Sequence, residues 1–154
     1  MAFDYVAAPL RCPMCNEVSS DPLAIDLQTK IAKSPAGNMI RPGDTVALID
    51  DPREPGYLLL NPGWQPGGSV LRVIQAWSCP YCATNPLWAV LTFQNGTLIS
   101  VEPVPLDAAT LAAADFITGE ALLLVPLQEV PRVRELPPEE LRRELAKAAK
   151  AGLA

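Results

Sequence analysis

The chain contains four cysteines, and they are its strongest candidates for a functional site. They occur as two pairs of the same pattern, CPMC at residues 12–15 and CPYC at residues 79–82, and 63 residues separate the pairs. A Cys-Pro-x-Cys unit places two sulfurs on one tight turn, and two such turns facing each other supply four thiolates in a tetrahedral arrangement. The pattern therefore predicts one metal site, with these ligands: Cys12, Cys15, Cys79 and Cys82.

The rest of the chain offers little catalytic chemistry. It contains no histidine, which removes Ser-His and Cys-His nucleophile pairs, histidine metal ligands and imidazole acid–base catalysis. No serine, threonine or lysine lies in a recognisable catalytic signature. A metal ion held by four protein ligands has no open position for a substrate, so the predicted ion is structural. We therefore expect a protein that is not an enzyme.

The two knuckles, as we call the CPMC and CPYC turns, resemble those of zinc ribbons and rubredoxins. CPMC is followed by PLAIDL (residues 22–27) and CPYC by PLWAVL (residues 86–91), so each knuckle is expected to lead into a strand. Where these families usually carry a glycine after the second cysteine, this chain has Asn16, which tolerates positive φ, and Ala83, which tolerates it less well. The resemblance implies one structural Zn²⁺, with iron as the alternative because both metals accept four thiolates.

The distance between the knuckles exceeds the usual spacing of about 15–20 residues. A longer loop costs only about 1 kcal/mol more to close, whereas structural zinc contributes on the order of 10 kcal/mol. We expect the extra length to form a small inserted β subdomain that uses the Pro/Gly-rich residues 34–68. Three aromatic residues near the second knuckle, Trp77, Tyr81 and Trp88, predict a capped and buried site. A buried site favours zinc over an exposed, rubredoxin-like iron.

CPYC also matches the active-site tetrapeptide of glutaredoxins, which implies dithiol redox chemistry. A redox CxxC lies at the start of a helix, whose N-terminus lowers the thiol pKa. Here Pro86 and a predicted hairpin follow the cysteines, and a redox function would leave Cys12 and Cys15 unused. Metal binding is therefore the favoured interpretation. Thiol redox, or rubredoxin-like electron transfer through the same cysteines, is the alternative function.

The clearest predicted element is a hairpin with strands at 87–94 and 97–104 around Asn95-Gly96, the dipeptide that type I′ turns prefer. Apolar and β-branched runs between Pro/Gly turns predict further strands, at 45–49, 57–60 and 70–77. Period-two alternation over residues 23–31 favours a half-buried strand, although Leu23, Leu27 and Ile31 also fit helical spacing.

The C-terminal third changes character. Asp107 is placed to cap a helix that runs to about Phe116, with Gly119 near its end. Residues 121–127 predict a short strand and residues 128–136 a linker. Residues 138–151 predict a helix, with acidic residues in its first turn and lysines in its last. Its apolar stripe is narrow and is expected to dock on the domain edge or on another subunit.

These elements predict an α+β fold: a β-rich antiparallel sheet or small barrel that carries the two-knuckle site, with one or two C-terminal helices. We expect residues 1–128 to form the zinc-binding domain, including the insert at 34–68, and residues 136–152 to contain the C-terminal helix. The same insert contains a candidate interaction loop. Asp50 and Asp51 could act as paired carboxylates, and Trp64 as a stacking platform, although an exposed turn and an inward-packed tryptophan are favoured.

The composition of the chain limits the classes of partner that it is expected to bind. A net charge of −5 lacks the positive field that phosphate backbones require, which disfavours nucleic acid. Apolar residues make up 49% and charged residues only 19%, which predicts apolar surface for a protein partner or a second copy. The N-terminal residues show no signal-peptide pattern, and no apolar run reaches 18 residues, so we expect a cytoplasmic protein without a membrane span. The expected function is an interaction module for a partner that is itself basic: an adaptor, an immunity or inhibitor protein, or an accessory subunit.

Overall fold

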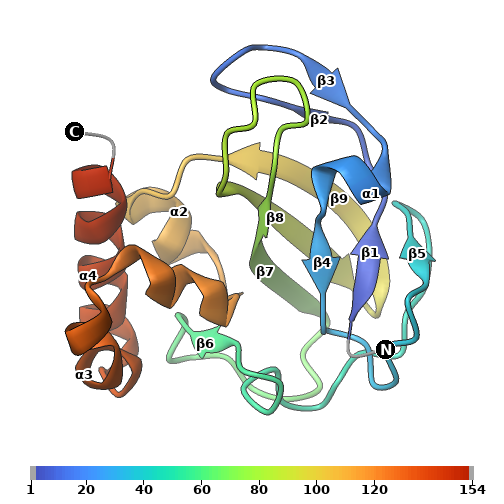
Figure 1. The fold of residues 1–154 in the computed structure, drawn as a ribbon. Helices are drawn as coiled ribbons and strands as arrows, with labels where there is room; N and C mark the ends of the chain where they lie inside the picture. The colour runs from blue at the N-terminus through green and yellow to red at the C-terminus, as the bar shows by residue number, and fades with distance from the viewer. Residues whose placement is uncertain (1–2, 153–154) are drawn as a thin grey trace.

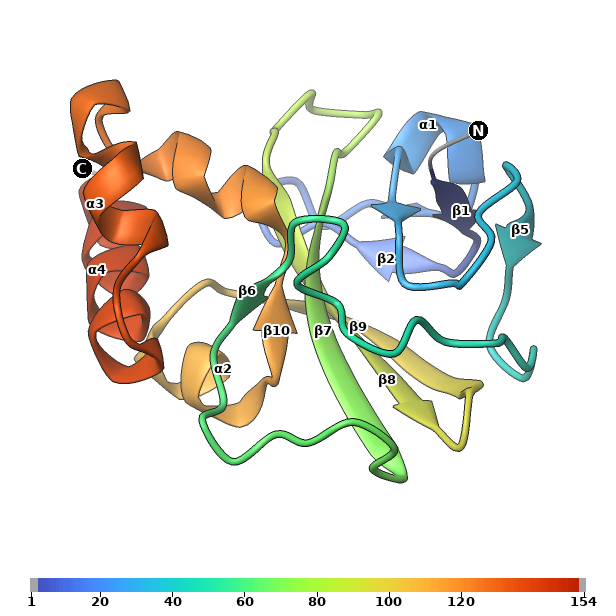
Figure 2. The same ribbon diagram turned by 90° about the horizontal axis from the view of Figure 1, so that it is seen from below.

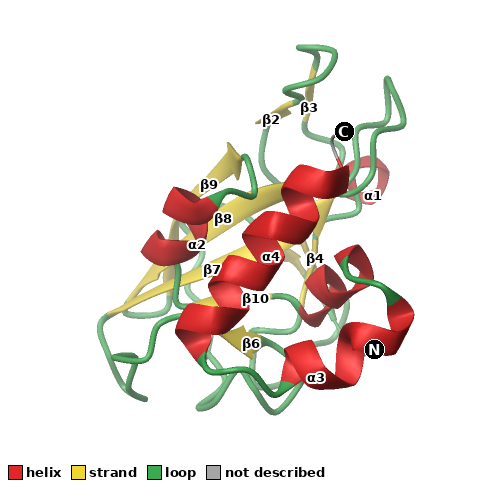
Figure 3. Cartoon of the chain, turned by 90° about the vertical axis from the view of Figure 1, so that its left-hand side faces the viewer, coloured by secondary structure: helices red, strands yellow, loops and turns green. Residues whose placement is uncertain are grey.

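The computed structural model describes residues 3–152 and arranges them in three layers (Figure 1). The middle layer is a five-stranded β-sheet in the order β6-β10-β7-β8-β9. Short strands and one short helix from the N-terminal part cover one face, and the C-terminal helices cover the other (Figures 1 and 3). The expected α+β class is confirmed. The part of the chain that the structure describes contains open sheets and no closed barrel.

Three long strands form the centre of the sheet. β7 (Val70–Trp77), β8 (Leu87–Gln94) and β9 (Thr97–Val104) are joined in antiparallel order. β10 (Phe116–Ile117) runs parallel to β7, and β6 (Leu58–Leu59) pairs antiparallel with β10. β6 is therefore an edge strand, as Figure 2 shows from below.

The predicted hairpin is confirmed. Asn95 and Gly96 both adopt positive φ, 50° and 82°, as a type I′ turn requires. Packing also requires glycine at this position. A Cβ at residue 96 would lie 2.7 Å from the carbonyl oxygen of Val46, which is too close for a non-bonded contact. The turn thus serves both the hairpin and the packing of the insert against it.

β7 and β8 are buried on both faces, and alternate side chains along each strand enter the two layers. Odd-numbered residues such as Val73 and Leu91 pack with the N-terminal layer. Even-numbered residues such as Ile74 and Trp88 pack with the C-terminal helices. The sheet therefore separates two hydrophobic cores.

The N-terminal layer consists of very short elements. They are β1 (Asp4–Val6), β2 (Leu10–Arg11), β3 (Val18–Ser19), α1 (Pro22–Ile25), β4 (Gln28–Thr29) and β5 (Met39–Ile40). β1 lies between β4 and β5 in one small sheet, and β2 pairs with β3 in another. Elements of two to four residues cannot be stable on their own, so this layer depends on its contacts with the sheet.

A buried hydrogen-bond network joins this layer to the sheet. The Tyr57 hydroxyl accepts from the backbone N–H of Lys30 (2.9 Å), lies 3.2 Å from Thr29 Oγ1 and donates to Gln75 Oε1 on β7. Tyr57, Thr29 and Gln75 are all at most 5% exposed. Burial raises the pKa of the Tyr57 phenol, which keeps the proton that it donates.

The C-terminal layer contains the regular helices. They are α2 (Ala108–Ala113), the 3₁₀ helices η1 (Gly119–Leu124) and η2 (Leu127–Glu129), α3 (Val130–Arg134) and α4 (Pro138–Gly152). The helix predicted at 138–151 is thus confirmed as α4. Its Leu141 and Leu145 are 2% and 0% exposed and pack in the core behind the sheet.

The strand predicted at residues 23–31 is wrong in its first half. Asp21 caps α1 by accepting from the backbone N–H of Leu23 (3.1 Å), and Pro22 occupies the first turn, where proline suits a helix. Asp26 then ends the helix in the left-handed region at φ 50°. Only Gln28–Thr29 remains as a strand, β4.

The insert at 34–68 does not form a β subdomain of its own. β5 pairs with β1, and β6 pairs with β10, so both of its strands join sheets outside it. The strand predicted at 45–49 is also wrong, because this segment makes only isolated bridges, such as Thr45 with Thr97. Short Pro/Gly-bounded runs complete existing sheets here rather than build a new one.

Three predictions in the C-terminal third need correction. Asp107 caps α2 by accepting from the N–H of Thr110 (2.9 Å), but the helix ends at Ala113, and Phe116 lies in β10. The strand predicted at 121–127 is instead η1, which begins at Gly119, a residue expected to lie at a helix end. The linker predicted at 128–136 contains α3.

Candidate metal centre

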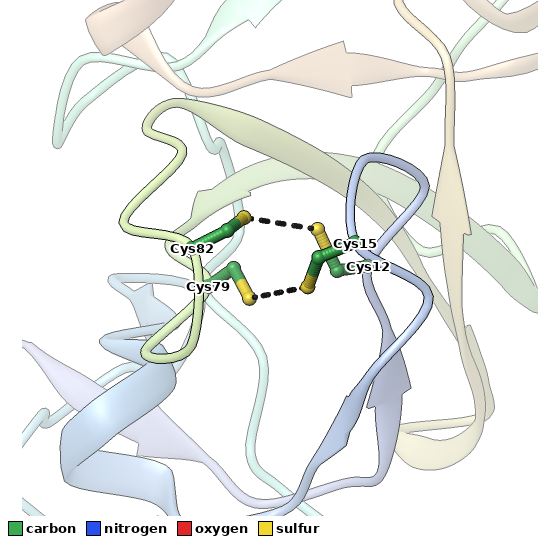
Figure 4. A group of neighbouring side chains, drawn as sticks. All are labelled: Cys12, Cys15, Cys79 and Cys82. Carbon is green, nitrogen blue, oxygen red and sulfur yellow. Dashed lines mark hydrogen bonds between the residues drawn. The ribbon is translucent and has the colours of Figure 1, made fainter.

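The four cysteines come together at one end of the molecule, with their sulfurs pointing toward a common centre (Figure 4). All four Sγ atoms lie within 4.8 Å of one another. The Cys12–Cys82 and Cys15–Cys79 sulfurs are 3.7 and 3.6 Å apart. A tetrahedral ion with metal–sulfur bonds of about 2.3 Å separates its ligands by about 3.8 Å, whereas a disulfide is about 2.05 Å. The spacing therefore fits four ligands of one ion, and all four cysteines are free thiols.

The two knuckles have the same backbone hydrogen bonds. In the first, the N–H of Asn16 donates to the carbonyl of Cys12 (2.9 Å), and in the second the N–H of Ala83 donates to Cys79 (2.9 Å). Each leading cysteine also donates its own N–H five residues ahead, to Glu17 (2.9 Å) or to Thr84 (3.1 Å). The two Cys-Pro-x-Cys turns therefore share the same backbone hydrogen-bond pattern.

The residue after each second cysteine adopts the left-handed conformation. Asn16 has a φ of 67° and Ala83 a φ of 60°. The sequence comparison with knuckles that carry glycine at this position predicts this conformation. Asparagine adopts it readily, but alanine does so at a cost of about 1–2 kcal/mol, because its Cβ crowds the backbone. The strain at Ala83 is therefore a specific difference between the knuckles.

Different elements position the two knuckles. The first is the turn between β2 and β3, and the second joins β7 to β8 at the end of the central sheet. The Ser78 N–H before the second knuckle donates to the carbonyl of Ile25 in α1 (2.8 Å). The expected repeat after the knuckles is wrong: PLAIDL forms α1, whereas PLWAVL enters β8. The likeness is confined to the turns themselves.

The predicted aromatic cap is wrong, and the site is buried only in part. Tyr81 is 63% exposed and Met14, at the same place in the first knuckle, is 64% exposed. Cys12 and Cys79 are buried, Cys15 is intermediate and Cys82 is exposed. Trp77 lies in the core, where its Nε1 donates to the Trp88 carbonyl (3.1 Å). Trp77 and Trp88 therefore pack in the cores on either side of the sheet, and Tyr81 is exposed, so none of the three caps the site.

Two thiols have shifted pKa values. The hydroxyl and backbone N–H of Thr84 lower the pKa of Cys82 to about 6, and the Cys82 Sγ lies 3.1 Å from Thr84 Oγ1. For Cys15, the backbone N–H of Glu17 lowers the pKa, but burial and the neighbouring sulfurs outweigh it and raise the pKa to about 12. Cys82 therefore loses its proton more readily than Cys15, and a bound cation would require both groups as thiolates.

Two supporting residues were not anticipated from the sequence. Thr84 contacts the outermost sulfur, and Arg11 Nη1 donates to the carbonyl of Asn16 (2.8 Å) behind the first knuckle. Both lie within two residues of a cysteine, so proximity in the sequence was the available signal. It is a weak signal, because a hydroxyl or guanidinium near a knuckle more often faces solvent.

The other predicted site residues lie in separate places. Asp50 forms an exposed ion pair with Lys33 (3.7 Å), while Asp51 accepts hydrogen bonds from Arg53 that lower the pKa of its carboxyl. Each aspartate therefore has its own cationic partner. Trp64 packs edge-on against Phe116, with ring centroids 4.8 Å apart. Their role as an interaction loop stays a prediction.

Comparison with protein-family models, with curated proteins and with solved structures finds no significant match to this chain. No helix within residues 3–152 is long and apolar enough to cross a bilayer.

Proposed function

We propose that this protein is a non-enzymatic, zinc-stabilised protein-interaction module with a zinc-ribbon-like site. The observation that carries the proposal is the convergence of four free thiols from two knuckles, with sulfur separations of 3.6 and 3.7 Å. Zn²⁺ is the common ion for four thiolates in a tetrahedral site. When bound, it supplies a cross-link between segments that are distant in the chain.

The ligand set supports a structural role. Cys12, Cys15, Cys79 and Cys82 would occupy all four tetrahedral positions, which leaves none for water or substrate. The second knuckle belongs to the central hairpin and the first to the short-stranded N-terminal layer. The ion would therefore clamp a layer that has little regular structure onto the sheet.

The surface of the fold favours a protein partner. Several large apolar side chains are strongly exposed, among them Met14, Tyr81, Leu123 and Leu127. The acidic chain, with a net charge of −5, disfavours nucleic acid and suits a partner with basic surface. An adaptor, an immunity or inhibitor protein and an accessory subunit are all of this kind, and a homo-oligomer would also bury apolar surface. Free thiols retained for metal binding are in keeping with a cytoplasmic location.

Elemental analysis of the purified chain tests the metal proposal. We expect one zinc per chain, with thiols that react with a disulfide reagent only after a chelator and denaturant are added. Cys12→Ser and Cys79→Ser should each abolish stoichiometric zinc. A chain that contains no metal and reacts at Cys79 while folded would overturn the proposal. Substrate turnover that survives purification would overturn its non-enzymatic part.

One observation favours a second candidate, a rubredoxin-like iron protein for electron transfer. The exposure of Cys82 and Tyr81 leaves one side of the site open to an approaching redox partner, which the expected aromatic cap would have blocked. Iron held by four thiolates is red when oxidised, and zinc is colourless. The absorption spectrum of the aerobically purified protein therefore separates the two candidates directly.

A further inference from the structure

A groove lies beside edge strand β6, and none of the four cysteines lines it. It has a volume of about 590 Å³, within the range of about 300–1,000 Å³ that is typical of ligand sites. Its walls come from β6 and the preceding turn, from η1, and from the segment that joins α3 to α4. Figure 2 shows this last segment running outside β6. The apolar lining consists of Leu58, Leu59, Leu122, Leu136, Pro138 and Leu141.

The groove follows an unpaired strand edge. The N–H of Leu60 donates to the carbonyl of Asp115 (2.8 Å), so Leu60 directs its backbone groups toward β10. Because the direction alternates along a strand, the N–H and carbonyl of Leu59 point the other way, to the free edge of the sheet. β6 is the outermost strand in the sheet order. An extended backbone laid in the groove would find a donor and an acceptor there.

The end of the groove near β6 is rigid. A Cβ at Gly119 would lie 2.7 Å from the carbonyl oxygen of Gly56, so the backbones of η1 and the insert are in direct contact. Both glycines line the groove. Next to them, the buried Tyr57 is held by its hydrogen bonds to Lys30 and Gln75. The groove is therefore a preformed feature of the fold, which lowers the cost of binding.

The charge of the groove is opposite to that of the protein. Its charged lining residues are Arg53 and Arg134, although the chain carries a net charge of −5. Asp51 holds the Arg53 guanidinium in place through Nε and Nη2, both at 3.0 Å. No ion pair within residues 3–152 involves Arg134, which is exposed at the end of α3. Arg134 is thus available to pair with a carboxylate brought by a ligand.

We propose that this groove binds an extended peptide segment of a partner protein, which adds as a strand to β6 and places an Asp or Glu side chain against Arg134. Apolar side chains of the segment would enter the leucine-lined groove, and its backbone would pair with Leu59. This is strand addition, in which main-chain hydrogen bonds give affinity and side-chain pockets give specificity. The inference rests on the proposed function and names the local chemistry of the partner, whatever the charge of the partner's remaining surface.

Selection from a random library of blocked decapeptides against the zinc-loaded full chain tests the proposal. We expect selected peptides to combine alternating apolar residues with at least one Asp or Glu. Arg134→Glu should weaken their binding about fivefold or more, as expected for a charged contact at an exposed position. The control Arg143→Glu makes the same charge change at an exposed position of α4 outside the groove, and should leave affinity unchanged.

Backbone methylation of a selected peptide tests strand addition without altering the protein. N-methyl groups at every second residue should abolish binding in one register and be tolerated in the other, because only alternate amides pair with β6. Equal tolerance of both registers, failure to select any peptide, or affinity that is insensitive to Arg134→Glu would overturn the groove proposal. If selected peptides bind independently of Arg134, the groove proposal fails but the proposed interaction module does not. If the purified chain contains no zinc, the zinc-stabilised module fails, and the Arg134→Glu and N-methylation results still decide whether the groove binds a peptide.

Discussion

The two faces of the central sheet are covered in different ways. On one face lie helices, including the fifteen-residue α4, whose Leu141 and Leu145 are buried in a continuous apolar core. On the other face lie strands of two or three residues and a four-residue helix, connected by Pro/Gly-rich turns. Both layers bury apolar side chains against the same strands, but the longest helix, α4, belongs to the helical layer.

The layer of short strands contains the first knuckle, so we expect metal binding to compensate for this difference. The helices of the C-terminal layer form local hydrogen bonds and need only an apolar stripe to dock on the sheet. The N-terminal layer, with its short strands and turns, loses more chain entropy for each contact that it makes. Two features compensate on that side: the cysteine cluster and the buried hydrogen bonds of Tyr57 with Thr29 and Gln75. We therefore expect the dependence of stability on the metal to be concentrated in the N-terminal layer.

Loss of a metal ligand should have the largest effect. Cys12→Ser and Cys79→Ser each break the same four-thiolate site, so both should lower the free energy of unfolding of the zinc-loaded protein by on the order of 5 kcal/mol. Hydrogen exchange should increase mainly in residues 3–49 and much less in α4. Chemical denaturation with and without a chelator measures the size of the effect, and exchange measures its location.

Two results would contradict this prediction. A mild effect of Cys12→Ser beside a severe effect of Cys79→Ser would mean that the knuckles do not share an ion. Equal loss of protection in both layers would mean that the metal stabilises the fold as a whole, and the contrast between the layers would fail.

Truncation of a buried side chain in α4 gives the matched comparison with the loss of a metal ligand. Leu145 is fully buried in α4, and Leu145→Ala should cost about 2–5 kcal/mol through lost burial and the cavity left behind. Zinc content should stay at one per chain, and the exposed Leu127→Ala, in a side chain that is 85% exposed, should change stability little. Loss of zinc in Leu145→Ala would show that the helical layer also holds the knuckles in place.

Removal of the Tyr57 hydroxyl tests the buried hydrogen-bond network that joins the N-terminal layer to the sheet. Tyr57→Phe leaves the Lys30 N–H without its acceptor and Gln75 without its donor, in a buried setting, which should cost about 1–3 kcal/mol. Zinc should still bind, because the hydroxyl does not contact the cysteines. Denaturant midpoints measure the loss of stability that Tyr57→Phe causes with and without the metal. Equal losses would show that the hydrogen-bond network and the metal site stabilise the fold independently.

The sequence alone predicts the features that depend on local chemistry. The knuckles follow from Cys-Pro-x-Cys, the hairpin from Asn95-Gly96, and α4 from its charged ends. The failures share a different cause. Residues 121–127 have the apolar content of a strand, yet only some of them face the core: Ala121 is fully buried, while Leu123 is 84% exposed. The Thr118 cap begins a 3₁₀ helix there, and long-range packing rather than local preference decides the outcome.

The exposure of the cysteine site was equally beyond sequence reasoning. Trp77 and Trp88 are adjacent to the second knuckle in sequence, but strand alternation sends them to opposite cores. The groove beside β6 also depends on segments that are far apart, since Gly56 and Arg134 meet only in the folded chain. The chemistry of the candidate site was therefore predictable, but its accessibility and the second surface were not.

The smallest predicted effect compares the two knuckles themselves. Ala83 holds a φ of 60° at a cost that glycine avoids, so Ala83→Gly should stabilise the zinc-loaded protein by about 0.5 kcal/mol after the greater flexibility of glycine in the unfolded chain is subtracted. Asn16 already tolerates its φ of 67°, so Asn16→Gly should be neutral or slightly destabilising. Denaturant midpoints of the two variants, measured with zinc bound, decide the matter. If both substitutions shift the midpoint in the same direction by the same amount, the strain assigned to Ala83 is absent, and the two turns are equivalent in energy as well as in hydrogen bonding.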